Sequence, residues 1–184
     1  MRGFSLIEVL VAVFVLGIGV LGAAATQVTA LRTRHESSLV SAAVQLATSL
    51  AERMQANASQ MHVPDATNPY LSLFYDAASE GAPSPPASLC LADAHCNAAQ
   101  LAALDVFEFK QAVHRHFPGG RVRVCRDAQP WHGGGHALRW ECAPGAAPVV
   151  IKFGWRGKNP DGSAAQDSAQ QFPPSVALAI AEAR

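Results

Sequence analysis

The sequence carries no excess charge of either sign, because 14 Lys and Arg residues balance 14 Asp and Glu residues. A neutral chain gives no global electrostatic case for binding nucleic acid or an anionic surface. Basic residues do gather between residues 121 and 158, where they could form a phosphate-contact patch. The aromatic residues there are patterned as core, so we interpret these cations as ordinary strand and turn charges and expect no nucleic-acid partner. They are Arg121, Arg123, Arg126, Arg139, Lys152, Arg156 and Lys158.

Motifs that carry catalysis or bind metal are also missing. The chain has no GxSxG nucleophile motif, no glycine-rich phosphate loop and no CxxC pair. His95 lies beside Cys90 and Cys96, and His132 lies near His136, but a zinc site needs four ligands at a fixed geometry. We therefore expect no enzyme activity, no metal and no cofactor.

Proline is absent from the first part of the chain, between Phe4 and Ala56, so nothing there forces a helix to break. The stretch from Phe4 to about Ala25 is apolar apart from Glu8, and as a helix of roughly 33 Å it could cross a bilayer. Beyond it, apolar positions recur every three or four residues, which predicts one long helix that continues past the membrane. These positions are Val28, Leu31, His35, Leu39, Ala42, Leu46, Leu50 and Met54.

Glu8 is the one acidic residue in the apolar run. An ionised carboxylate at membrane depth costs several kcal/mol, so such an acid is a functional candidate whose partner has to be found. If the chain were cut after Gly3, the new amino terminus on Phe4 would be a cation at the same depth. Glu8 and this amine could then neutralise each other.

The segment from Gly3 to Ala12 resembles the type IV prepilin family, whose members carry a short basic leader ending in Gly. The family motif continues with Phe and then Ser/Thr-Leu-Ile-Glu-Val-Leu-Val-Ala, and this chain matches it at every position. The resemblance implies cleavage after Gly3 by a prepilin peptidase and N-methylation of Phe4. It also implies that the long first helix, with Glu8, assembles into a filament core.

Two other interpretations of the N-terminal segment remain open. A secretory signal peptide would have a basic start, here Arg2, and small residues at a cleavage site, here 23–25. Its apolar region is usually 7–15 residues long and uncharged, whereas this run is longer and contains Glu8. A plain membrane anchor explains the length of the run but does not require Glu8.

Charge also predicts the orientation in the membrane. Arg2 precedes the apolar run and no basic residue follows before Arg32, so the N-terminus is expected in the cytoplasm. Together with the prepilin resemblance, this orientation implies a single-pass inner-membrane protein with a periplasmic C-terminal domain, which later enters a pilus. We divide it into a leader (1–3), a transmembrane helix (4–26), the periplasmic half of the helix (27–57) and a head domain (58–184).

Four cysteines in an oxidising compartment predict two disulfides. Three pairings are possible, and the sequence does not choose among them. We expect Cys90–Cys96, which are close in sequence, and Cys125–Cys142, on successive predicted strands. The second bridge poses a difficulty, because the alternation of side chains places Cys125 and Cys142 on opposite faces, so a bulge or a crossed connectivity is required.

The head is predicted to be α+β, with the long helix packed on a small antiparallel sheet at about 121–184. Asp105 as N-cap and Glu108 three residues later predict the start of a second helix, which Pro118 ends. Strands are predicted at 121–126, 137–142 and 149–155, the first two joined as a hairpin and the third half-buried. The segment 176–180 favours a final edge strand, although its alanines would also suit a helix.

Two further segments are similar to minor pilins of the PilV kind. They are Leu50 to Asn57 and the stretch from Leu104 to Arg121, in which Phe109 replaces the usual Trp. The resemblance implies a minor pilin that helps to prime pilus assembly, together with other minor pilins, the major pilin and the inner-membrane assembly platform. Alternatives are a type II secretion pseudopilin, which shares the N-terminal motif, and a pilus-tip adhesin or DNA-uptake receptor.

Overall fold

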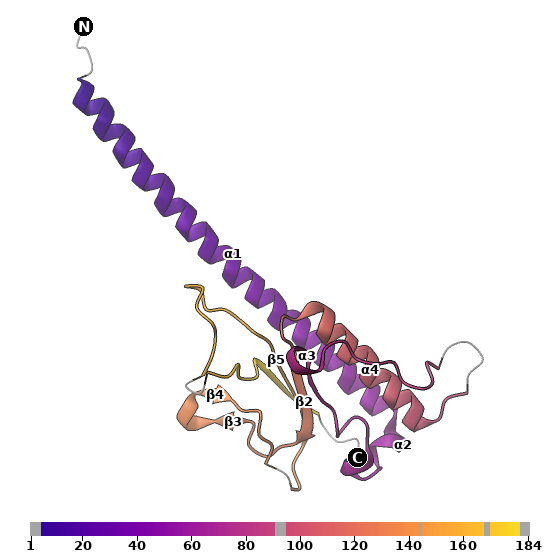
Figure 1. Ribbon diagram of the computed structural model, residues 1–184. Coiled ribbons are helices and arrows are strands. Elements are labelled where there is room, and N and C mark those ends of the chain that lie inside the picture. The colour runs from indigo at the N-terminus through magenta and orange to yellow at the C-terminus, as the bar shows by residue number, and fades with distance from the viewer. Residues whose placement is uncertain (1–4, 91–94, 144, 168–169, 181–184) are drawn as a thin grey trace.

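One continuous helix forms the long axis of the molecule. The computed structural model describes residues 5–90, 95–143, 145–167 and 170–180. Helix α1, Leu6–Ala56, runs unbroken for 51 residues, and its N-terminal half projects away from the rest of the chain (Figure 1). The backbone N–H of Asn57 ends the helix with a 3.0 Å bond to the carbonyl of Arg53. The predicted long helix is therefore confirmed, as expected from a segment without proline.

The head is a four-stranded antiparallel sheet with helices against one face. The strand order is β1-β2-β5-β6, with β1 at Phe74–Asp76, β2 at Arg121–Arg126, β5 at Val149–Gly154 and β6 at Val176–Ile180. Helix α4, Ala98–His116, lies beside the C-terminal half of α1 (Figure 1). This arrangement confirms the predicted α+β fold. Shorter elements are α2 (Ala58–Met61), η1 (Asp65–Thr67), α3 (Ala77–Glu80), β3 (Trp131–His132), η2 (Gly133–Gly135) and β4 (Ala137–Leu138).

The main core lies between the sheet and the two long helices. In the antiparallel register, Val122 of β2 is opposite Phe153 of β5 and Val124 is opposite Ile151, so these side chains share the inner face. The Phe117 ring packs edge-on against Phe153, with 4.5 Å between the ring centroids. Each such side chain, once fully buried, contributes about 1.5–3 kcal/mol relative to an exposed one. From α1 the core receives Leu39, Ala43, Ala47, Leu50, Ala51 and Met54.

The start of α4 differs from the prediction. The helix begins at Ala98, and its N-cap is Asn97, whose Oδ1 accepts the backbone N–H of Gln100 at 2.9 Å. Gln100 Oε1 in turn accepts the N–H of Asn97 at 3.0 Å, so the capping box lies about two turns earlier than expected. Asp105 and Glu108 have the same spacing, but they lie inside the helix and both bond to Arg53. The predicted cap at Asp105 is therefore wrong.

The predicted strand at 137–142 is also wrong for most of its length. Only Ala137–Leu138 is extended, as β4, and it pairs with β3 in a small hairpin of its own. Strand β2 pairs with β1 and β5 instead. The chain after β4 crosses the outer face of the sheet, where it buries Trp140 and Ala147. Burial of these apolar side chains explains why the segment leaves the extended hairpin.

This crossing segment also corrects the expectation that β5 is half-buried. All six residues of β5 are buried, because Trp140 and the chain around it cover the face that points away from the helices. Gly154 shows how close the cover lies: a Cβ there would come within 3.0 Å of Trp140 Cζ2 and 2.9 Å of the Pro173 carbonyl oxygen.

Of the two edge strands of the sheet, the sequence predicts one and misses the other. The predicted edge strand at 176–180 is confirmed as β6, which pairs with β5 from Val149↔Ile180 to Phe153↔Val176. Strand β1 was not predicted, because only three residues, Phe74–Asp76, pair with β2 and so short a run gives no clear alternation.

Candidate assembly surface

Most of the large apolar side chains that are exposed in the described part of the chain lie on the N-terminal half of α1. Among the residues that the structure describes, α1 is the one helix long and apolar enough to cross a membrane, and none of its apolar stretch is buried. Leu6 is 80% exposed and Leu21 is 73% exposed. Exposed apolar surface on this scale marks a membrane-embedded or protein-interaction surface. The other large exposed side chains here include Ile7, Val9, Leu10, Val13, Phe14, Leu16, Ile18 and Leu31.

Glu8 lies at the start of this surface. Its Oε2 accepts the backbone N–H of Ser5 at 2.9 Å, so in the single chain the carboxylate bonds to an otherwise unsatisfied N–H at the helix start. The partly positive N-terminal end of a helix also favours an acid in the first turn. Gly3 and Phe4, the predicted cleavage and methylation positions, lie outside the described residues. The pairing of Glu8 with an amine on Phe4 therefore stays a prediction.

The free part of α1 ends where the head first contacts it, at Arg32 and Glu36. Glu36 Oε2 accepts the indole N–H of Trp155 at 3.1 Å, and Oε1 accepts the backbone N–H of Lys158 at 3.0 Å. Arg32 lies against Gly162, where a Cβ would come within 2.7 Å of Arg32 Nη1. These contacts fasten the loop after β5 to the helix. No local sequence pattern predicts these contacts, because Glu36 and Trp155 are 119 residues apart.

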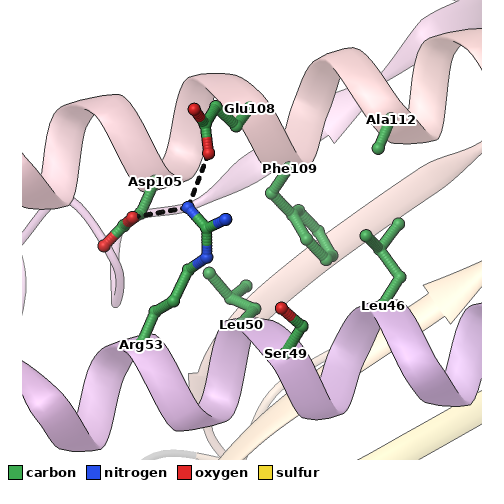
Figure 2. Close-up of a pocket in the computed structure, with 8 residues that line it drawn as sticks. All are labelled: Leu46, Ser49, Leu50, Arg53, Asp105, Glu108, Phe109 and Ala112. Atoms are coloured by element: carbon green, nitrogen blue, oxygen red, sulfur yellow. Dashed lines mark hydrogen bonds and ion pairs between the residues drawn. The ribbon is translucent and has the colours of Figure 1, made fainter. Parts of the chain in front are cut away.

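A second attachment, at the other end of the head, centres on Arg53. Its Nη1 donates to Asp105 Oδ1 at 2.7 Å and to Glu108 Oε2 at 2.6 Å, so one guanidinium of α1 binds two carboxylates of α4 (Figure 2). The hydrogen bonds with Glu108 and Asp105 raise the pKa of Arg53 above its ordinary value. Beside this cluster, α1 and α4 border a groove of about 150 Å³ that Leu46 and Phe109 help to line.

Asp105 also binds a buried tyrosine. The hydroxyl of Tyr70 donates to Asp105 Oδ2 at 2.5 Å, and Asn57 Nδ2 donates to the Tyr70 oxygen at 3.4 Å. Burial, and then the bond to Asp105, raise the pKa of Tyr70 well above its ordinary value, so the hydroxyl stays a donor. The end of α1 is thus joined through Arg53 and Asn57 to α4 and to the segment before β1.

Both predicted disulfides are present, and none of the four cysteines is free. Cys90 and Cys96 have Cα atoms 5.6 Å apart, and Cys125 and Cys142 have Cα atoms 6.4 Å apart. The conflict of faces at the second bridge does not arise, because Cys142 lies in the irregular crossing segment and not in a strand. This bridge holds that segment to β2.

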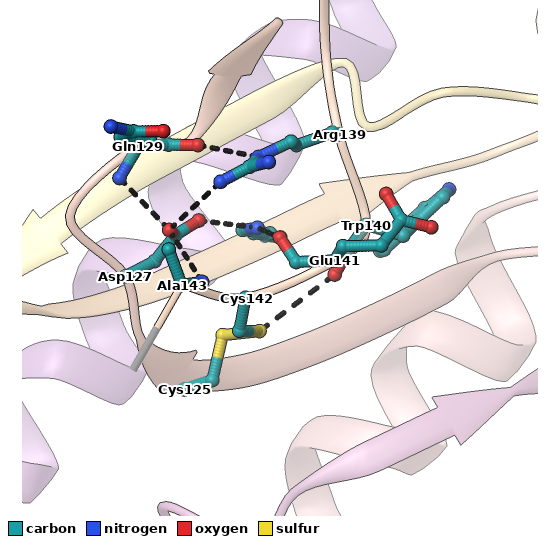
Figure 3. A network of polar contacts seen from close by, with 9 residues as sticks. Cys125, Asp127, Gln129, Arg139, Trp140, Glu141, Cys142 and Ala143 are labelled. Atoms are coloured by element: carbon teal, nitrogen blue, oxygen red, sulfur yellow. Dashed lines mark hydrogen bonds and ion pairs between the residues drawn. A yellow bond between two sulfur atoms is a disulfide. The ribbon is translucent and has the colours of Figure 1, made fainter. Parts of the chain in front are cut away.

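The crossing segment covers a buried ion pair. Lys152 of β5 points to the outer face, where its Nζ lies 2.6 Å from Asp127 Oδ2 and donates to the carbonyl of Glu141 at 2.5 Å (Figure 3). Asp127 Oδ1 accepts the backbone N–H groups of Gln129 and Ala143 at 2.9 and 3.0 Å. Burial by itself raises the pKa of Asp127, but the bonds from Lys152 and from these backbone groups outweigh it and hold the pKa below its ordinary value.

The basic residues around the sheet therefore do not form one patch. Lys152 is fully buried and paired, and Arg126 Nε lies 3.0 Å from Asp65 Oδ2. Arg139 donates to the carbonyl of Gln129 at 2.6 Å. The histidines singled out by the sequence do not gather either: the part of the chain that the structure describes holds no group of three or more His, Cys, Asp or Glu residues suited to a metal ion.

A projecting apolar helix fastened to a disulfide-bonded α+β head is the architecture of a membrane-anchored, pilin-like protein. Comparison with known proteins agrees: residues 1–24 match the prokaryotic N-terminal methylation motif, and residues 25–107 match the family described as Type IV pilin Tt1218. The two matches adjoin and extend from the first residue into α4. The chain belongs to the type IV pilins and carries the methylation motif of prepilins. Neither the curated proteins nor the solved structures that were compared gave a significant match.

Proposed function

We propose that this protein is a minor pilin that takes part in priming and assembling a type IV pilus. The observation that carries the proposal is the exposed apolar half of α1 with Glu8 as its one charged residue up to Leu31. A lone apolar helix has to be covered by lipid before assembly and by other helices afterwards. In such a role the protein acts through helix packing with other pilins, and the attachments at Glu36 and Arg53 keep the head fixed on the helix.

The proposal includes the path of the chain through the cell. Prepilin peptidase cuts after Gly3 and Phe4 becomes the methylated first residue, while residues 4–26 span the inner membrane with the N-terminus in the cytoplasm. The head is then periplasmic, which agrees with its two disulfides, since such bonds persist in oxidising compartments. Its expected partners are the major pilin, other minor pilins and the assembly platform.

Processing is tested by intact mass of the mature protein. Gly3→Val should block trimming, because a larger side chain does not suit a pocket built for glycine, and membrane insertion should be unaffected. Gly17→Val is the matched control, since a Cβ at Gly17 meets nothing within 4 Å. A mature chain that starts at Thr26 would instead establish a signal peptide and overturn the pilin pathway.

The assembly role is tested by deleting the gene, counting pili and identifying the proteins that co-purify with the tagged chain. Loss of pili, restored by the wild-type gene, together with recovery of minor pilins supports the proposal. Normal pili with a defect in protein secretion would point to the pseudopilin alternative. Normal pili with loss of surface binding or DNA uptake would point to an adhesin or receptor.

A further inference from the structure

A corner of the sheet brings two arginines to one pocket. In the register of the sheet, Arg121 is opposite both Asp76 of β1 and Gly154 of β5, and Arg156 follows two residues after Gly154. The ends of three strands therefore meet here. The pocket has a volume of about 320 Å³, and we call it the Arg121–Arg156 pocket. It is lined mainly by Asp76, Arg121, Trp140, Arg156, Gln171 and Phe172.

Within the described residues, Arg121 is held by packing against aromatic rings, whereas Arg156 is exposed and lies over Gly119. The guanidinium of Arg121 lies 4.5 Å from the centroid of the Trp140 ring and 5.4 Å from that of Phe74. The stem of Arg156 crosses Gly119 so closely that a Cβ on Gly119 would come within 2.8 Å of Arg156 Cδ. The packed side chain of Arg121 therefore loses less conformational freedom when a ligand binds.

The positive charge of the pocket is not neutralised within the described part of the chain. Neither Arg121 nor Arg156 forms an ion pair there, whereas Arg126 and Lys152 do. Arg121 Nε is buried without a hydrogen-bond partner. Asp76 lines the pocket, but its Oδ1 accepts the backbone N–H of Ala78 at 2.9 Å and it pairs with neither arginine.

The shape and charge of the pocket indicate the class of ligand. Two guanidinium groups and one carboxylate leave a single positive charge, which suits a monoanion better than a dianionic phosphate. A planar guanidinium matches the two oxygens of a carboxylate, and the amide of Gln171 adds a neutral hydrogen-bonding group. The volume is at the lower end for ligand pockets, so it suits one side chain and not a large molecule.

We propose that the Arg121–Arg156 pocket binds the carboxylate of an aspartate or glutamate side chain on a partner protein. The site is separate from the apolar surface of α1, so it gives the head a charge-specific contact of its own. The proposal does not depend on the minor-pilin function, because binding is measured directly and not through pilus formation.

The test uses the full-length protein in detergent micelles, labelled with ¹⁵N at its tryptophans. The chain has 3 tryptophans, so the indole N–H signals are few and can be assigned by Trp→Phe substitution. Trp140 lines the pocket, and its indole donates to the carbonyl of Phe172 at 2.8 Å, so its signal should respond to a ligand. Trp131 is exposed outside the pocket and serves as the internal reference.

The probe is an acetylated, C-terminally amidated peptide, Gly-Ser-Glu-Ser-Gly, and its control is the same peptide with Gln in place of Glu. The Glu peptide should shift the Trp140 signal saturably and leave Trp131 unchanged, with at least tenfold weaker binding of the Gln peptide. Arg156→Gln and Arg121→Gln should each weaken binding at least tenfold. Arg123→Gln is the matched control, because Arg123 is on the same face of β2, has no ion pair in the described chain and does not line the pocket.

Several results would overturn the proposal. The first two are the absence of a saturable shift of the Trp140 signal and equal affinity for the Glu and Gln peptides. The others are a loss of affinity in Arg123→Gln as large as that in Arg156→Gln, and tighter binding of inorganic phosphate than of the Glu peptide. Arg121 is packed between two rings, so its variant could misfold; the Arg156→Gln variant, with an unchanged tryptophan spectrum before ligand is added, then decides the outcome.

Discussion

Asp127 and Lys152 form a fully buried ion pair, with 2.6 Å between Oδ2 and Nζ and neither side chain exposed to solvent. Taking both charges out of water costs several kcal/mol, which their attraction offsets only with good geometry and further hydrogen bonds. Both conditions are met here, because Asp127 accepts two backbone N–H groups and Lys152 donates to Glu141. The pair therefore ties the crossing segment to β5 in a way that depends on both partners.

Removing one partner of this pair should be much worse than removing both. Lys152→Met leaves a buried carboxylate whose remaining ion-pair partner is Arg139, with Nη2 3.9 Å from Asp127 Oδ1, and it should lower the free energy of unfolding by about 3 kcal/mol. Asp127→Asn combined with Lys152→Met keeps the acceptor for Gln129 and Ala143 without the charge, so the double variant should recover most of this loss. The free energies of unfolding of the single and double variants can be measured by urea unfolding in detergent, with the near-ultraviolet circular dichroism of the tryptophans as the signal. Arg123→Met is the control, and a double variant as unstable as Lys152→Met would contradict the prediction.

The same carboxylate should make the head sensitive to acid. Because the pKa of Asp127 lies below its ordinary value, its contribution to stability is present above the unfolded-state pKa of about 3.9 and is lost as the pH falls through the lowered pKa. The free energy of unfolding should therefore drop below about pH 4, and the drop should be smaller in Asp127→Asn. Asp161→Asn is the control: the hydrogen bond from Ser163 also lowers the pKa of Asp161, but this group is exposed. If the free energy of unfolding falls equally below about pH 4 in the wild type and in Asp127→Asn, Asp127 is not the group responsible.

The two disulfides should differ in their effect on stability. Cys125–Cys142 closes a separation of 17 residues and Cys90–Cys96 one of 6. From loop entropy alone, replacing the first pair by serines should cost about 3 kcal/mol and replacing the second about 2 kcal/mol. The first change should also loosen the cover over Lys152, which hydrogen exchange at Ala143 would detect. Thiol alkylation and mass spectrometry of the native protein should find no free thiol, and two or more reactive thiols would refute the pairing.

Glu8 should matter for assembly and not for insertion. Its carboxylate lies on an apolar surface, where an unpaired charge is costly. In an assembly it could meet the Phe4 amine of a neighbouring subunit and set the axial register of the two helices. The Glu8→Gln variant should therefore still insert into the membrane and be cut after Gly3. Fewer partner pilins should co-purify with it than with the wild-type protein. The measurement is co-purification at matched membrane levels; equal recovery and equal piliation would show that Glu8 has no assembly role.

Local sequence patterns predicted the elements whose signals are regular and long. Freedom from proline predicted α1, and alternation of apolar residues predicted β2, β5 and β6. The disulfide pairing also agrees with the prediction. The helices and strands depend on residues that are close in sequence, so each segment carries its own signal, whereas the disulfide pairing is one of three that the sequence leaves open.

The errors have a common cause in contacts between distant segments. Asp105 and Glu108 have the spacing of a capping box, but Arg53, 52 residues before Asp105, binds them both. The alternating pattern at 137–142 predicted a strand, but the chain leaves the extended conformation so that Trp140 is buried on the sheet. Lys152 alternates like a solvent-facing residue, and only its pairing with Asp127 allows it to be buried. No local pattern contains these partners.

The attachment of the head at Glu36 fixes how far the head stands from a bilayer. The free part of α1, from Leu6 to Leu31, is about 26 residues or ~39 Å long, whereas the hydrocarbon core is about 30 Å thick. In the membrane orientation that we propose, a modest surplus of helix would separate the hydrocarbon from the head and would bring Arg32, Arg34 and Lys158 to the level of the lipid phosphates. Cations at that level are each worth about 1 kcal/mol on an anionic leaflet. On this proposal, a subunit drawn out of the membrane would give up lipid-phosphate contacts before hydrocarbon contacts, so the composition of the leaflet would set part of the work of extraction.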